Sequence, residues 1–67
     1  MSVYKVVELV GTSTTSWEDA ALTAVRTAKE TLRDLRVAEV VEQDLELGGD
    51  EVLFRTKLSI SFKYQAE

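Results

Sequence analysis

The chain has 67 residues, 45% hydrophobic and 30% charged, and it contains neither cysteine nor histidine. This composition is typical of one small globular domain, and it excludes disulfide bonds and the usual zinc ligands. The net charge of −4 argues against nucleic-acid binding, which requires basic residues to neutralise phosphates. We expect a single domain over residues 1–67 that gains stability by self-association, because so short a chain buries little of its surface.

Targeting signals are not evident in the sequence. No apolar run approaches the roughly 18 residues that a membrane-spanning helix needs. The first residues, Met1 to Lys5, lack the basic start and long apolar stretch of a signal peptide. A cytoplasmic protein is therefore expected.

The first half of the chain predicts a strand, a loop and a helix. Residues 3–10 are rich in β-branched side chains, and residues 11–15 have loop composition. Ser16 is the expected N-cap of the helix, with Asp19 as a capping-box-like partner three residues later. Apolar residues then recur at helical spacing, at Trp17, Ala20, Ala21, Ala24, Val25, Ala28, Leu32 and Leu35. Because this stripe is mostly alanine, we expect the helix to lie close against a sheet.

The second half predicts a long hairpin. Residues 36–47 form the expected second strand, residues 48–50 (Gly-Gly-Asp) predict a tight turn, and residues 51–64 alternate cleanly as a third strand of about twice the usual length. With strict alternation, one face of the second strand carries Val37, Glu39, Val41, Gln43, Leu45 and Leu47, and the other carries Ala38, Val40, Glu42, Asp44 and Glu46. Both faces begin apolar, so we expect each to be covered.

The elements together predict an α+β fold of order βαββ, in which a three-stranded antiparallel sheet curls against one helix. The pattern leaves open whether the connection through the helix leads to an antiparallel neighbour or to an order-skipping parallel placement.

Three stretches of the chain resemble the dodecin family. They are the strand end VGTS at residues 10–13, the segment ETLRDLRVAEVVEQ at residues 30–43, and the long final hairpin. The resemblance spans essentially the whole chain. It implies a hollow homododecamer with helices outside and sheets lining the cavity, so the main partner would be further copies of the same chain.

Flavin-binding dodecins stack paired isoalloxazine rings on a tryptophan, and a glutamine on the third strand binds the ring edge. The matching positions here are Val37 and Arg55, and Gln43 completes the candidate flavin-binding residues. Valine lacks the flat π surface that stacking requires, which is worth about 0.5–1.5 kcal/mol per aromatic pair. Arg55 is expected either to donate to flavin carbonyls or to pair with an acidic neighbour such as Glu39.

A second branch of the family, the calcium dodecins, also lacks the stacking tryptophan. The chain resembles this branch more closely, through SVYKV at residues 2–6, TSWE at residues 15–18 and RVAEVVEQD at residues 36–44. The candidate metal ligands are Glu42, Asp44 and Glu46, whose spacing of two residues places them on one strand face about 7 Å apart. Calcium takes six to eight oxygens, so only symmetry-related copies together could complete such a site, and a solvated acidic face is the alternative.

Three functional hypotheses follow. The first is a non-enzymatic dodecameric shell that binds calcium or another divalent cation, with a small ligand as a further candidate. The second is a flavin-binding dodecin that stores riboflavin or FMN, and the third is an interaction module without a ligand. An enzyme ranks last, because the hydroxyl run at residues 12–16 has no partner base.

Trp17 is expected to anchor the start of the helix in the core or at a subunit contact rather than to stack on a ligand.

Overall fold

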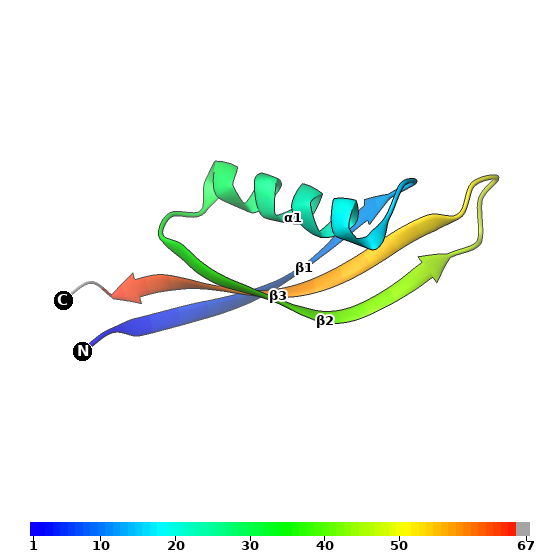
Figure 1. Cartoon of the computed structure of the whole chain (residues 1–67). Helices are drawn as coiled ribbons and strands as arrows, with labels where there is room; N and C mark the ends of the chain where they lie inside the picture. The colour runs from blue at the N-terminus through cyan, green and yellow to red at the C-terminus, as the bar shows by residue number, and fades with distance from the viewer. Residues whose placement is uncertain (66–67) are drawn as a thin grey trace.

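The computed structural model describes residues 1–65 and has the predicted βαββ order (Figure 1). Strand β1 spans Val3–Ser13, helix α1 Trp17–Thr31, strand β2 Leu35–Glu46 and strand β3 Leu53–Gln65. The sheet order is β1-β3-β2, and β3 is antiparallel to both neighbours. The α+β fold with a three-stranded antiparallel sheet is thus confirmed. The connection through α1 skips a position, since β1 and β2 lie parallel on opposite sides of β3.

Helix α1 packs on one face of the sheet through its alanine stripe. Ala20, Ala24 and Ala28 are buried, and they meet a core in which Leu58 and Ile60 of β3 are each 1% exposed. These small side chains allow the close approach that the sequence predicts. We call the covered side of the sheet the helix face and the opposite side the open face.

Gly11 marks the point where the helix comes closest to β1. A Cβ atom at this position would overlap the carbonyl group of Ala20 and would lie 3.1 Å from Cβ of Ala24. The strand therefore continues through Gly11 to Ser13, beyond the predicted end at Val10. The sequence pattern predicts a loop from Gly11 onward, whereas the glycine lies within β1 and lets two backbones approach.

The helix starts where the sequence predicts. Ser16 is the N-cap, and its hydroxyl accepts a hydrogen bond from the Asp19 amide at 2.9 Å. In a full capping box the Asp19 side chain would also accept from the backbone amide of Ser16. Here Ser13 lies between these two groups. The Asp19 carboxylate accepts from the Ser13 hydroxyl at 2.7 Å, and Ser13 Oγ accepts in turn from the amides of Thr15 at 2.9 Å and Ser16 at 3.4 Å.

The helix ends earlier than the apolar stripe suggests. Its last residue is Thr31, and Leu32 is the C-cap with extended backbone angles. Asp34 then adopts a left-handed conformation with φ 58°, and its carbonyl accepts from the Lys63 amide at 3.1 Å. Leu35 accordingly begins β2, where it still packs against the core. The helical spacing of Leu35 reflects its burial and not its secondary structure.

The hairpin differs from the prediction at its tip. Strand β2 stops at Glu46 and β3 starts at Leu53, so the connection is the longer loop Leu47–Val52, which we call the tip loop. Neither of its glycines has a positive φ, so the predicted tight turn of the glycine-dependent type is not formed.

Candidate functional site

Two irregularities in β2 decide which side chains stand on the open face. The pairing with β3 shifts between Leu35 and Val37 and again between Val40 and Glu42. At each shift two β2 residues oppose one β3 residue, which defines a β-bulge. Because paired residues of antiparallel strands share a face, each bulge reverses the alternation of all residues that follow it.

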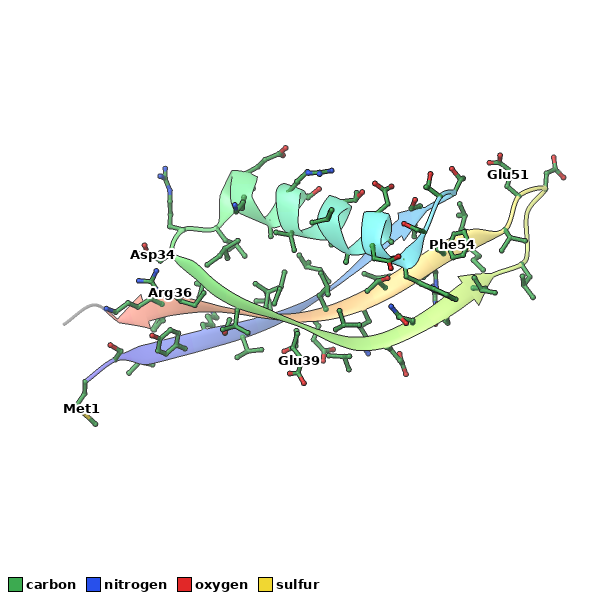
Figure 2. The ribbon with its side chains drawn as sticks, viewed as in Figure 1. Met1, Asp34, Arg36, Glu39, Glu51 and Phe54 are labelled. Atoms are coloured by element: carbon green, nitrogen blue, oxygen red, sulfur yellow. The ribbon has the colours of Figure 1, made fainter. Side chains whose placement is uncertain are left out.

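The bulge at Val41 corrects the predicted faces of β2. The open face carries the β2 residues that pair with Arg55, Lys57, Ser59 and Ser61 of β3. In the same order these are Asp44, Glu42, Glu39 and Val37, and Glu46 lies opposite Leu53. Residues that pair with Thr56, Leu58 and Ile60 lie on the helix face, and these are Gln43, Val40 and Ala38. Figure 2 shows Glu39 directed away from α1. The acidic residues therefore share a face with Val37, whereas strict alternation had placed them opposite it, and Gln43 stands on the other side.

All residues of β2 after Leu35 are exposed. The helix lies mainly over β1 and β3, so after Leu35 the edge strand β2 has little cover from its own chain (Figure 1). Val37 is 60% exposed, and Val6 and Val10 on the open face of β1 are 58% and 52% exposed. The open face thus combines apolar patches with carboxylates.

Arg55 and Asp44 form a two-pronged ion pair across the hairpin. Arg55 Nε donates to Asp44 Oδ1 at 2.7 Å, and Arg55 Nη2 donates to Oδ2 at 2.9 Å. The hydrogen bond from Arg55 lowers the pKa of Asp44 and outweighs the opposing effect of desolvation. The hydrogen bond to Asp44 likewise raises the pKa of Arg55, with smaller contributions from the charges of Glu46 and Glu42. The partner of Arg55 within the chain is therefore Asp44 and not Glu39.

The start of the helix is fixed to the same part of the hairpin. The indole Nε1 of Trp17 donates to the carbonyl oxygen of Asp44 at 3.1 Å, and its ring meets Phe54 edge to face at a centroid distance of 5.1 Å. The fully buried Thr56 donates from Oγ1 to the carbonyl oxygen of Trp17 at 2.8 Å. Trp17 thus anchors the helix start, as expected from its place on the apolar stripe.

The candidate metal ligands do not form a site within one chain. Among residues 1–65, no group of three or more acidic side chains is close enough to hold a metal ion. Both carboxylate oxygens of Asp44 are engaged by Arg55. Within the same residues, no salt bridge involves Glu42 or Glu46. Lys57 is the sheet partner of Glu42, but its Nζ lies 3.6 Å from Oε1 of Glu8 on β1.

A pocket of about 170 Å³ lies where α1 ends and β2 begins. We call it the α1–β2 pocket; its lining consists of Val25, Lys29, Leu35, Arg36, Val37, Ala38 and Ile60. Among these residues, Val37 alone is a binding residue predicted from the sequence. The pocket depends on the early end of the helix and on the bulge at Arg36, and neither has a signal in the periodicity of the sequence.

None of the helical structure in residues 1–65 is long and apolar enough to cross a membrane.

Comparison with known proteins agrees with the geometry. The dodecin family model matches residues 3–65. The calcium dodecin of Mycobacterium tuberculosis is 50% identical over 64 residues, which are 94% of this chain and 90% of that protein. A crystal structure of M. tuberculosis calcium dodecin, described as a calcium-chelating antigen with a novel calcium-binding site, has a TM-score of 0.85 at 46% identity, covering 98% of this chain and 96% of that one.

Two further solved structures extend this similarity to other bacteria. A point mutant of the Thermus thermophilus dodecin has a TM-score of 0.88 at 37% identity, covering 98% of this chain and all of that one. The Streptomyces coelicolor dodecin has a TM-score of 0.87 at 30% identity, covering 98% and 96%. With a family match along almost its whole length and a relative at half identity, the chain belongs to the dodecin family.

Proposed function

We propose that the protein is a non-enzymatic homododecameric shell that binds divalent cations, with calcium as the principal ion. The observation that carries this proposal is the acidic edge of the open face, where the bulge at Val41 places Glu42, Asp44 and Glu46 beside Val37 on one side of an uncovered strand. The 50% identity to a protein named calcium dodecin supports the choice of ion.

The shape of a single copy supports assembly. Its radius of gyration is 13.5 Å, with extents of 49 × 20 × 16 Å. A compact domain of this length would have a radius of about 11 Å. Its accessible surface is 4930 Å², against about 4,250 Å² for a typical monomer of its mass. An elongated protomer with apolar residues on both faces of an edge strand gains stability when further copies cover them.

The carboxylates favour a cation shared between copies. Calcium binds six to eight oxygen atoms at about 2.3–2.6 Å, and carboxylates spaced along one strand cannot converge to this distance. Glu42 and Glu46 are exposed, and a symmetry axis that brings copies of this edge together would supply additional oxygens. The ion pair with Arg55 holds Asp44 in place, so we assign Glu42 and Glu46 as the main ligands and Asp44 as a positioning residue.

The hydroxyl groups near the helix start support a role without catalysis. Ser13 and Ser16 are engaged in capping the helix, and Thr56 is buried in a hydrogen bond with the backbone. The sequence offers no histidine or cysteine that would activate or replace them.

Flavin storage is the second candidate, because Val37 and Arg55 do lie on the same face of the sheet. Three features weaken it. Val37 provides no aromatic surface, and the donors Nε and Nη2 of Arg55 are already engaged by Asp44. Gln43, the third candidate residue, lies on the helix face.

Calcium titration of the purified protein tests the proposed function. We expect calcium to raise the melting temperature, since an ion at 100 times its Kd stabilises the folded state by about 2.7 kcal/mol per site, and we expect chelator to reverse the shift. The double variant Glu42→Gln/Glu46→Gln should lose the response. The control Glu18→Gln/Glu30→Gln, which removes the same charge from exposed helix positions, should keep it. The absence of a shift at millimolar calcium would contradict the proposal.

A further inference from the structure

The α1–β2 pocket has an apolar floor and a basic rim. Its floor includes Leu35 and Ile60, and Lys29 and Arg36 are the charged residues of its lining, which contains no acidic side chain. Cavities of about 150 Å³ accommodate molecules as large as benzene, so the pocket, at about 170 Å³, has room for one leucine side chain. Its geometry suits an apolar group flanked by negative charge.

The tip loop has the complementary character. Leu47 is 71% exposed and Val52 48% exposed. Glu46, Asp50 and Glu51 flank these residues in the sequence, and no basic residue occurs between Glu46 and Leu53. Exposure of a leucine side chain to water at the end of a long hairpin is unfavourable. Its transfer into an apolar pocket is therefore favourable.

The two glycines of the tip loop fit the same interpretation. Neither has a positive φ. A Cβ atom at Gly48 would meet nothing within 4 Å, and one at Gly49 would approach only the Glu51 carbonyl oxygen, at 4.0 Å. Nothing in the described part of the chain therefore requires glycine at these positions. A loop that inserts between the side chains of another molecule does benefit from a slim backbone.

The tip loop cannot reach the pocket of its own chain. The pocket is lined by the first residues of β2, and the tip loop follows the last, so the two features lie at opposite ends of this strand. Figure 1 shows β2 running away from the end of α1 toward the tip. A contact between them must join two copies head to tail, and such a heterologous contact produces either a closed ring or an open chain of subunits.

We infer that Leu47 of one copy occupies the α1–β2 pocket of a neighbouring copy, with Glu51 and Asp50 facing the neighbour's Arg36 and Lys29. This contact deepens the proposed function, because it names surfaces that hold the shell together. It does not depend on which ion or ligand the shell binds.

Light scattering on a concentration series tests this contact. We expect Leu47→Asn and Arg36→Glu each to raise the protein concentration at which the assembly half dissociates by about tenfold or more, the change that each 1.4 kcal/mol of lost affinity produces. Arg26→Glu, which makes the same charge change at an exposed helix residue outside the pocket, should leave the mass unchanged. Adding Glu51→Arg to Arg36→Glu should restore the assembly, most clearly at low salt.

Circular dichroism shows whether each variant is folded, and Gly48→Leu provides a second route. A Cβ atom at this position meets nothing within 4 Å, so the larger side chain should leave the fold intact while it obstructs insertion and lowers the mass. The inference is overturned if the assembly is unaffected by Arg36→Glu and Gly48→Leu. Loss of mass without rescue by Glu51→Arg would assign the pocket to a different segment of the neighbour and would also overturn it.

The two proposals fail separately. A pocket variant that dissociates while the wild-type protein ignores calcium supports the contact and rejects the cation. An assembly that responds to calcium but tolerates every pocket and tip variant supports the cation and rejects the contact.

Discussion

Asp44 joins two interactions that come from opposite sides of its strand: its carboxylate binds the guanidinium of Arg55, and its carbonyl oxygen accepts the indole hydrogen of Trp17. One residue of the edge strand thereby links the open face to the start of the helix. The link lies near the tip end of β2, which ends at Glu46.

The ion pair predicts how stability changes with pH. The pKa of Asp44 is lowered from 3.8, so the pair stabilises the folded state above pH 3.8, and this contribution disappears as the pH falls through the lowered pKa. We expect wild-type protein to melt at a higher temperature than Asp44→Asn in neutral solution, and the difference to shrink in acid. Glu30→Gln is the control, since no salt bridge involves Glu30 among residues 1–65. A difference that persists unchanged in strong acid would contradict the assignment.

Gly11→Ala tests the close approach of α1 to β1. The added Cβ would overlap the Ala20 carbonyl, and overpacking of this kind costs about 1–3 kcal/mol. Thr27→Ala, at an exposed helix position, is the control, because surface substitutions stay within about 0.5 kcal/mol. Urea unfolding at a fixed protein concentration measures both. Equal midpoints for the two variants would show that the helix can move away from the strand at no cost.

Ser13→Ala tests the hydroxyl that replaces half of the capping box. The change removes the donor to Asp19 and the acceptor for the amides of Thr15 and Ser16. We expect a loss of about 1–2 kcal/mol, in the range measured for helix caps. Thr14→Ala, at an exposed neighbour in the same loop, should have little effect. If chemical denaturation gives the same free energy for both variants, the hydrogen bonds of Ser13 do not contribute to stability.

Val37→Trp tests the reason for doubting flavin storage. Val37 lies on the open face and is 60% exposed, so an indole at this position has room to meet a flavin ring. We expect the wild-type protein to leave riboflavin fluorescence unchanged and the variant to quench it, because each aromatic pair contributes about 0.5–1.5 kcal/mol beyond burial. Val6→Trp, on the open face of β1, controls for nonspecific quenching. Strong quenching by wild-type protein would establish the flavin alternative.

The sequence predicted what depends on local chemistry and regular spacing. The N-cap at Ser16, the alanine contact surface and the long alternating strand all follow from residue type and period. It failed where tertiary contacts override the period. Leu35 continues the helical stripe but belongs to β2, because Asp34 turns the chain through a left-handed conformation.

The candidate site could be predicted only in part for the same reason. The grouping of Glu42, Asp44 and Glu46 survives, since all three follow the bulge, but their position relative to Val37 does not. A bulge leaves no mark on an alternating pattern when both faces of a strand carry mixed residues. Within residues 1–65 these carboxylates do not converge on a metal site, so the proposed calcium site needs oxygens from further copies.

The central position of β3 determines when the fold can form. Strands β1 and β2 both pair with β3, and β3 is the last element in chain order. During synthesis from the N-terminus, both earlier strands therefore leave the ribosome with their hydrogen-bonding edges unmatched, and no part of the sheet can close before residues 53–65 emerge. Formation of the sheet thus waits for residues 53–65, and the newly made chain depends on their rapid pairing to avoid aggregation through its free strands.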